Sequence, residues 1–491
     1  MRNLFRTGIY TLVFAVLSLV FLNSCNSEQL LQLDELPLKE KVEFVNNPYV
    51  IDEGAAIAAG SQFIGELDGI VVKSGNVTLR SSVRTNTEKA SVSVRNYNVK
   101  IAELSSKEKA VKQVIPVYTI NYKDQSEKSD GFIVVAGDER IEDGNVILFS
   151  EVGALDLSQR GDDDFIDDLI SGFLYNQINR IEDESKVSTR GYSIVDYGDS
   201  YQYTISMFPQ FNQIGAPFNN YTPFRSGVRA KAGSEAVAVS QVIAHNQWPL
   251  QGAFKRYTTS TPSPVNVSVS YQLTSTEWGD LRSSNVAYWS AFSPNVIEYV
   301  ANLITDVGYK LNTSYGNTRS EAFPVNIPAV LTQMGYTSSL MKSYSLADIQ
   351  YDIEVEEIPL IMSGSTNPSD PYYSDPYDPN PLVAKSHTYT VAGTYYKNYN
   401  TASLPRNIYI KIFHGDGNGA FFTFPTGGMQ VWFNSLLFST SNSTPPYDPT
   451  QNGDKVYPYR YKCFIISSIK PNFSNFGCTN PAWTVPASYP Y

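Results

Sequence analysis

The sequence predicts an α+β protein, in which helices and strands occupy different parts of the chain. In the C-terminal part, two helical patterns within residues 233–307 precede a series of strand-like runs that begins near residue 387. In the N-terminal part, strand-like runs lie between two helical patterns. Helices grouped before strands indicate an α+β fold. At 491 residues the chain is too long for one hydrophobic core, so we expect two or three domains.

The N-terminal part begins with a helix. Asp52 can cap this helix, whose small apolar face runs from Ala55 to Ile64. A second helix is expected where apolar residues repeat every four positions from Phe165 to Leu174. The charged stretch that follows, residues 182–190, is interpreted as a linker. Between the two helices, strands are expected at residues 114–122, 132–136 and 146–150.

The C-terminal part opens with a helix that should be buried on every side. The pattern between Gly233 and Trp248 contains the apolar residues Ala236, Val237, Ala238, Val239, Val242 and Ile243, and Pro249 ends it. A further helix is expected at residues 295–307. Strand-like runs then follow at residues 388–395, 408–413, 421–424, 429–433 and 461–469. Two stretches rich in Pro, Asp and Tyr are interpreted as surface loops able to bind a partner, at residues 368–381 and 444–454.

The N-terminus has the pattern of a secreted lipoprotein. Arg2 and Arg6 precede an apolar run at residues 10–22, and the sequence Leu-Asn-Ser-Cys closes it at Cys25. This run is shorter than the roughly 20 residues that a membrane-spanning helix needs, which favours a cleaved signal. We therefore expect a lipid on Cys25 and a place in the bacterial cell envelope, outside the cytoplasm, with the outer membrane or cell surface favoured.

The composition argues against several classes of partner and cofactor. A net charge of -11 argues against nucleic acid as a partner. After lipidation only Cys463 and Cys478 remain, and an oxidising compartment permits a disulfide between them, although their spacing does not decide it. The chain has three His and no Cys or His cluster of metal-binding type, so we expect no metal and no other cofactor.

Three polar residues stand out by their order: Gln213, then Ser234 at the start of the buried helix, then His387 at the start of the β half. With their flanking segments they resemble the streptopain family of papain-like cysteine peptidases, which have a Gln, a Cys and a His in this order. The segments that carry the resemblance are QFNQIGAPFN at 210–219, GSEAVAVSQVIAHNQWP at 233–249, YVANLITDVGYKLNTSYG at 299–316 and SHTYTVAG at 386–393. Residues 117–138 and 163–181 resemble the inhibitory prodomain, or Spi domain, that precedes these enzymes.

The resemblance implies a papain-like fold with a helical half and an antiparallel β half, preceded by a small α+β prodomain. It implies that Gln213 holds the oxyanion position, Ser234 the nucleophile position and His387 the position of the base. The implied organisation is a signal peptide at 1–24, a lipidated tether at 25–40, a Spi-like prodomain at 41–190 and a streptopain-like peptidase domain at 191–491.

Two of the catalytic positions depart from the family pattern. Ser234 replaces the nucleophilic Cys, and a serine hydroxyl is too weak an acid to form the thiolate-type ion pair on which this chemistry depends. The later family motif Asn-Trp-Gly-Trp-Gly corresponds here to Phe413-His414-Gly415-Asp416-Gly417. Phe413 then stands in place of the Asn that orients the base, and its ring cannot accept a hydrogen bond from imidazole. We expect peptidase activity to be lost.

Each retained residue also has a purely structural interpretation. Ser234 is a good helix N-cap, which explains a serine at that point. Gln213 can bond loop backbone, and His387 can be structural at the head of a strand. His414 and Asp416 could form a replacement dyad, but their spacing is more typical of a Gly-rich turn.

The sequence therefore predicts a surface lipoprotein of the streptopain-type family that is catalytically inactive. Its expected role is to bind a peptide or protein in the old substrate cleft, or to inhibit or escort active relatives. Two alternatives remain: Ser234 and His387 form a working serine hydrolase, or the prodomain inhibits cysteine peptidases. The expected partners are a peptide or protein ligand and, through the lipid, a membrane.

Overall fold

The structure is a computed structural model. It describes residues 41–67, 71–74, 77–80, 85–101, 104–105, 109–124, 130–141, 146–159, 165–184, 197–207, 211–247, 251–258, 265–270, 273–282, 292–317, 320–365, 386–399, 407–413, 415, 422–423, 430–438 and 462–472. The signal peptide, Cys25 and both Pro- and Tyr-rich loops lie outside these residues.

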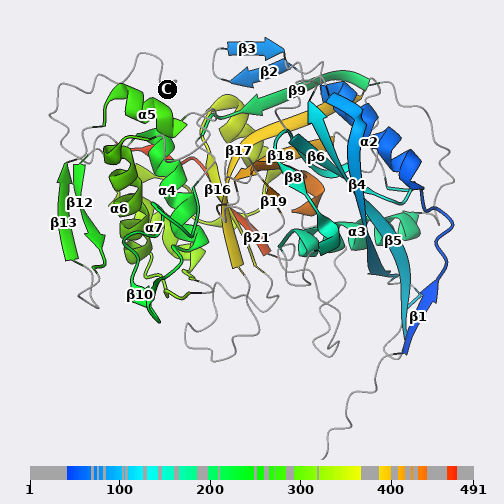
Figure 1. The fold of residues 1–491 in the computed structure, drawn as a ribbon, viewed down its shortest axis with the longest axis horizontal. Helices are drawn as coiled ribbons and strands as arrows, with labels where there is room; N and C mark the ends of the chain where they lie inside the picture. The colour runs from blue at the N-terminus through cyan, green and yellow to red at the C-terminus, as the bar shows by residue number, and fades with distance from the viewer. Residues whose placement is uncertain are drawn as a thin grey trace, which may run out of the picture.

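The fold is a mixture of helices and an extended, mainly antiparallel sheet, which confirms the predicted α+β class. Figure 1 shows the helices α4 to α7 gathered on one side, the strands β16 to β18 in the middle, and β4, β5, α2 and α3 on the other side. Strand order along the sheet is β1-β5-β6-β7-β20-β18-β17-β16-β21-β15, with β4 on β5 and β9 on β17 off this path. One sheet therefore extends through both predicted domains.

The N-terminal part confirms the expected helices and strands and adds five strands, β1, β2, β3, β4 and β8. Asp52 caps the first helix by accepting a 2.7 Å hydrogen bond from the Ala55 backbone N–H. The second helix extends to Glu184, so the first residues of the expected linker are helical instead. The elements are β1 (Lys41–Val45), α2 (Glu53–Leu67), β2 (Val71–Ser74), β3 (Val77–Arg80), β4 (Thr85–Lys100), β5 (Lys109–Asp124), β6 (Asp130–Ala136), β7 (Val146–Ser150), β8 (Ala154–Leu155) and α3 (Phe165–Glu184).

The C-terminal part begins with helices and short hairpins. Its first elements are β9 (Tyr197–Thr204), β10 (Phe224–Arg225), β11 (Val228–Arg229), α4 (Ser234–Asn246), β12 (Gln251–Arg256), β13 (Val265–Ser270), α5 (Ser275–Arg282), α6 (Pro294–Lys310), α7 (Ile327–Gln333), β14 (Tyr336–Thr337), β15 (Lys342–Ser343) and α8 (Leu346–Gln350). The strands that follow are β16 (Leu360–Ser365), β17 (Ser386–Tyr399), β18 (Asn407–Phe413), β19 (Phe422–Thr423), β20 (Gln430–Asn434), β21 (Lys462–Ile466) and β22 (Lys470–Pro471). The five expected strand runs all contain strands.

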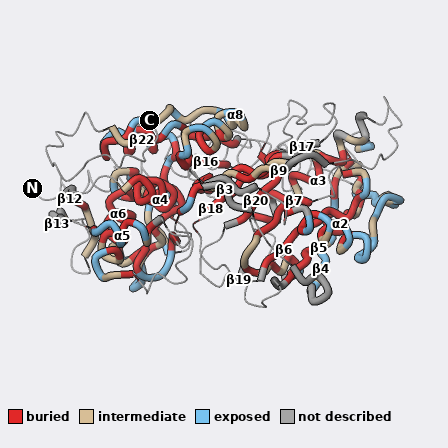
Figure 2. Tube along the Cα trace, turned by 90° about the horizontal axis from the view of Figure 1, so that it is seen from above, coloured by how far each residue is buried: buried red, intermediate tan, exposed pale blue. Residues whose placement is uncertain are grey.

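Helix α4 is the centre of the helical half. All 13 of its residues are buried, as its apolar sequence predicts, and Figure 2 shows it in red among its neighbours. The helix ends at Asn246, and Gln247 follows in the left-handed conformation (φ 55°), two residues before Pro249. Helix α6 packs along one side of α4, and strand β17 packs along another.

The two predicted domains meet inside the sheet. Strand β7 pairs antiparallel with β20, with Phe149 opposite Trp432 and Leu148 opposite Phe433. The predicted boundary at residue 190 lies outside the described residues and stays a prediction. Among the residues that the structure describes, no helix is both long and apolar enough to cross a membrane.

Candidate functional site

Ser234 is the first residue of helix α4. The residue before it, Gly233, is the N-cap, has φ 92° and makes no side-chain capping bond. The interpretation of Ser234 as the N-cap is therefore wrong, because the sharp turn needs a positive φ at the capping position, which glycine adopts freely. Just ahead of the turn, the Ala232 backbone N–H donates to the Gln213 carbonyl at 2.9 Å, so the predicted oxyanion segment lies beside the start of α4.

Strand β17 supplies the other side of the site. Successive side chains of a strand point to opposite faces. His387 and Tyr389 share one face, where their rings stack with centroids 6.1 Å apart. Thr388 lies on the face that meets α4, and its backbone N–H donates to Ser234 Oγ at 3.3 Å. Within the described residues, the hydrogen bonds of Ser234 go to Thr388 and Glu235 rather than to His387.

Glu235 is a site residue that the sequence analysis missed. Its side chain is 1% exposed, and Oε1 accepts a 3.2 Å hydrogen bond from the Thr388 hydroxyl. The pKa of this carboxyl is raised to about 7, mainly by burial and to a lesser degree by the charge of Glu321, against the lowering effect of bonds from the Glu235 backbone N–H, Thr388 and Ser234. The available signal was a single acidic residue at the start of a helix that the sequence predicts to be buried.

A second polar contact lies two residues further along β17 and six residues further along α4. The Thr390 hydroxyl lies 2.7 Å from Gln241 Oε1, to which it donates, and 3.3 Å from the Ala238 carbonyl. The Thr388 hydroxyl also lies 3.0 Å from Ser363 Oγ on β16. The contact between α4 and β17 is thus a row of buried hydroxyl, amide and carboxyl groups. We call it the α4–β17 contact and define it by Ser234, Glu235, Gln241, Thr388 and Thr390.

The segment in place of the family's Asn motif also reaches this helix. Phe413 is 1% exposed at the end of β18 and pairs with Thr390 of β17. Two residues later, Gly415 has φ 73°, and a Cβ there would lie 2.8 Å from Val237 Cγ1 of α4. Position 413 therefore lies close to the site, where it presents a ring without a hydrogen-bond acceptor. His414 and Asp416 lie outside the described residues.

Of the two cysteines predicted to pair, only Cys463 lies within the described residues. In the structure, Cys463 is a free thiol on β21, and burial raises its pKa to about 12. Cys478 lies outside the described residues, so the disulfide stays a prediction. In the described part of the chain, no group of three or more His, Cys, Asp or Glu is placed to hold a metal ion.

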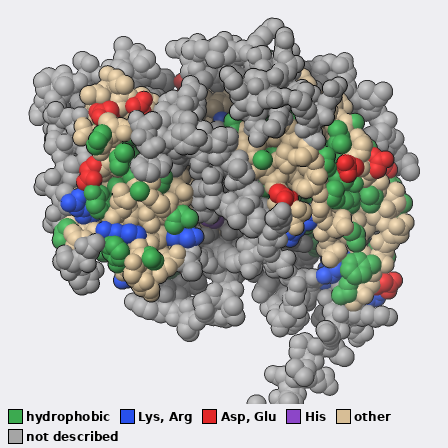
Figure 3. All heavy atoms as spheres, in the orientation of Figure 1, with side chains coloured by type: hydrophobic (Ala, Val, Ile, Leu, Met, Phe, Trp, Pro, Cys, Tyr) green, Lys and Arg blue, Asp and Glu red, His purple; other side chains and the backbone are tan. Residues whose placement is uncertain are grey.

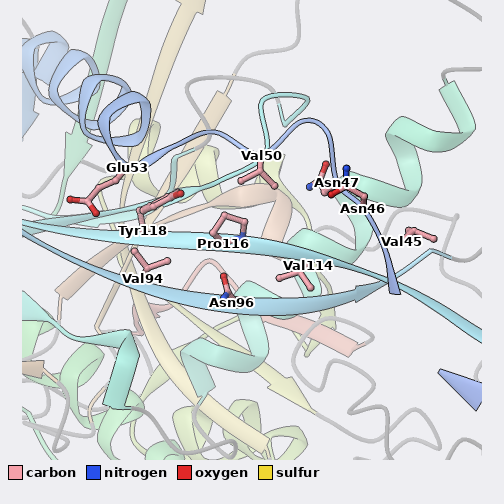
Figure 4. Close-up of a pocket in the computed structure, with 10 residues that line it drawn as sticks. All are labelled: Val45, Asn46, Asn47, Val50, Glu53, Val94, Asn96, Val114, Pro116 and Tyr118. Carbon is pink, nitrogen blue, oxygen red and sulfur yellow. The ribbon is translucent and has the colours of Figure 1, made fainter. Parts of the chain in front are cut away.

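A pocket lies in the N-terminal part of the described chain. It is a pocket of about 530 Å³ between the segment that follows β1 and the strands β4 and β5 (Figure 4). Valine side chains and asparagines line most of it, and Glu53 at the start of α2 is its carboxylate. The lining combines no nucleophile with a base, so the pocket lacks the parts of a hydrolytic site. On the face drawn in Figure 3, acidic and basic side chains are interspersed.

Comparison with known proteins finds a family match over the segment that contains α4 and β17. Residues 211–400 match the model of the Peptidase C10 family. No curated protein matches the chain. Among solved structures, a mutant prointerpain A fragment from Prevotella intermedia is 16% identical, with 77% of this chain and 99% of that chain covered and a TM-score of 0.41. Active wild-type interpain A cysteine protease from the same organism is 16% identical, with 54% and 94% covered and a TM-score of 0.33.

The helical half and the antiparallel β half, with Ser234 at their contact, define a cysteine-peptidase-like domain. Its residues 211–400 belong to the peptidase C10 family, the streptopain family, which confirms the resemblance seen in the sequence.

Proposed function

We propose that this protein is a lipid-anchored, catalytically inactive peptidase homologue whose cleft binds a peptide or protein. The observation that carries the proposal is the bonding of Ser234. Its Oγ accepts the Thr388 N–H and bonds with Glu235, whereas a working nucleophile bonds with its base. The Ser234 side chain is also nearly enclosed, because the residue is 5% exposed.

The position of His387 supports the same proposal. Its ring lies on the side of β17 that carries Tyr389, whereas Thr388 meets α4. Phe413, which pairs with Thr390 on the adjacent strand, supplies no hydrogen-bond acceptor at the position of the family's orienting Asn. In an unrelated protease, loss of the nucleophile alone lowers the rate on the order of 10⁶-fold. We therefore expect the cleft to retain binding and to lack turnover.

The test uses the whole mature chain after Cys25, because the sheet joins both predicted domains. The protein is treated with a serine-reactive phosphonate, and labelled peptides from a casein digest are used to measure cleavage and binding. We expect peptides to bind without label at Ser234 and without cleavage. Gln213→Ala and His387→Ala should weaken binding, whereas Glu53→Gln, in the pocket of Figure 4, should not. Phosphonate labelling that Ser234→Ala abolishes would contradict the proposal.

One observation favours a serine hydrolase as the second candidate. A carboxyl whose pKa is near 7, bonded to a serine hydroxyl, has the properties of a general base, and Glu235 would then replace His387 in that role. Casein cleavage by the wild-type chain, lost in both Ser234→Ala and Glu235→Gln, would establish this candidate. Inhibition of cysteine peptidases through residues 41–190 is the third, and inhibition assays with the full mature chain test it.

The anchor is proposed from the sequence alone. Lipidation requires the Cys25 thiol, so Cys25→Ala should release the protein from the membrane fraction or leave an uncleaved signal. A Cys25→Ala protein that still partitions into detergent as a mature form would rule out the lipid anchor.

A further inference from the structure

Glu235 occupies an unusual position for a carboxyl group. It is the one acidic residue of α4, directly follows Ser234, and is almost fully buried. Buried carboxylates are usually paired with a cation. Within the described residues, no Lys or Arg forms an ion pair with Glu235, and its bonds come from the uncharged groups of Thr388, Ser234 and its own backbone. The carboxyl is therefore stabilised by hydrogen bonds alone.

One residue holds Ser234 and Glu235 side by side. The Thr388 backbone N–H reaches Ser234 Oγ at 3.3 Å, and the hydroxyl of the same Thr388 reaches Glu235 Oε1 at 3.2 Å. The second carboxyl oxygen, Oε2, is buried without a hydrogen-bond partner. A negative charge at position 234 would therefore lie next to the Glu235 carboxyl, and neither solvent nor any ion-paired cation of the described residues would screen the repulsion between them.

We propose that Glu235 is a positioning residue that holds position 234 as a neutral hydroxyl and excludes a thiolate there. A hydroxyl can donate a hydrogen bond to a carboxylate, whereas a thiolate can only accept one. Two negative charges at contact distance in a buried site oppose each other's ionisation. Glu235 would then be a third departure from cysteine-peptidase chemistry, beside Ser234 and Phe413. This inference rests on the proposed loss of activity and predicts that a thiol restored at position 234 alone would remain largely protonated.

The other groups around Glu235 do not relieve this repulsion. Glu321 adds to it, because its charge raises the pKa of Glu235. On strand β16, the residue that bonds the Thr388 hydroxyl is Ser363, which is uncharged. On β17, His387 lies on the face away from the Thr388 side chain. A thiol introduced at position 234 and the Glu235 carboxyl would consequently titrate as one coupled pair.

The experiment compares Ser234→Cys with the double variant Ser234→Cys/Glu235→Gln in the mature chain. The rate of iodoacetamide alkylation at position 234 is followed against pH by site-resolved mass spectrometry, which separates it from Cys463 and Cys478. We expect the glutamine to lower the thiol pKa by at least one unit, which is about 10-fold more thiolate at neutral pH. Ser234→Cys/Glu321→Gln is the matched control and should show a smaller shift, since Glu321 acts only through its charge.

A conservative variant separates charge from packing. Ser234→Cys/Glu235→Asp keeps the carboxyl and should alkylate as slowly as Ser234→Cys, and Ser234→Cys/Glu235→Ala provides a second neutral variant if the glutamine destabilises the fold. Equal pH profiles for the charged and neutral variants would overturn the inference. Phosphonate labelling of wild-type Ser234 would instead overturn the proposed inactivity. The comparison of thiol pKa values between the variants could still be interpreted in that case.

Discussion

Two contacts in the molecule, that of α4 with β17 and that of β7 with β20, differ in their chemistry. The α4–β17 contact consists of buried hydroxyl, amide and carboxyl groups joined by hydrogen bonds. The contact between β7 and β20, which joins the predicted prodomain to the rest of the sheet, is aromatic. There Phe149 and Trp432 stack with centroids 5.9 Å apart and planes 8° apart, and Phe63, Tyr395 and Tyr409 pack around them.

The two contacts therefore have different effects: one attaches the predicted prodomain, and the other orients polar side chains around Ser234. Burial of aromatic surface is non-directional and strongly stabilising, which suits a permanent joint. Buried polar groups stabilise little on balance but fix orientation, since each partner left without its bond is costly. The aromatic contact thus favours a predicted prodomain that stays packed against the rest of the sheet. The polar contact determines which group Ser234 can bond.

The largest expected effect comes from breaking the aromatic contact. Trp432→Ala removes a buried ring that packs against both parts of the sheet, and such substitutions cost about 3–5 kcal/mol. Thermal unfolding followed by circular dichroism should show one cooperative transition at a lower temperature. Phe44→Ala, at a residue that is 56% exposed, is the control and should change the unfolding temperature little. Two separate unfolding transitions in the wild-type protein would show that the aromatic contact does not couple the predicted prodomain to the predicted peptidase domain.

Glu235 should give the polar contact a pH dependence. The pKa of its carboxyl is raised from 4.5 to about 7, so the folded state binds the proton more tightly than the unfolded state. The resulting stability is fully present below pH 4.5 and is lost as the pH rises through 7. The free energy of unfolding should fall by roughly 2–3 kcal/mol between about pH 4.5 and 8 relative to Glu235→Gln. Parallel curves for the two proteins would contradict this prediction.

The smallest effect is expected at the second polar pair. Thr390→Val preserves side-chain shape but removes the hydroxyl that donates to Gln241, leaving that buried acceptor without its bond. The cost should be about 1–3 kcal/mol in urea unfolding. Thr332→Val removes a hydroxyl that bonds within the exposed face of α7 and should cost less. An equal cost at both sites would mean that burial of the α4–β17 contact adds nothing.

Short-range sequence patterns predicted many of the helices and strands, because capping and apolar periodicity depend on residues close together in the chain. A helical segment rich in Ala, Val and Ile predicted a helix buried on every side, and α4 has that character. Asp52 predicted a capped helix start, and alternating or apolar runs predicted β5, β6, β7 and β18. The long strand β4 was missed because its sequence is mostly polar. It is extended because β5 pairs with it over most of its length.

The sequence by itself determined the family, the order of Gln213, Ser234 and His387, and the loss of the thiol, since residue types and their order need no coordinates. Only the tertiary structure decided which partners Ser234 has. The Thr388 hydroxyl that bonds Glu235 lies 153 residues away along the chain, and its direction depends on the register of β17 against β16 and α4. Hydrogen-bond partners are set by positions within tenths of an ångström, and packing between distant segments fixes those positions.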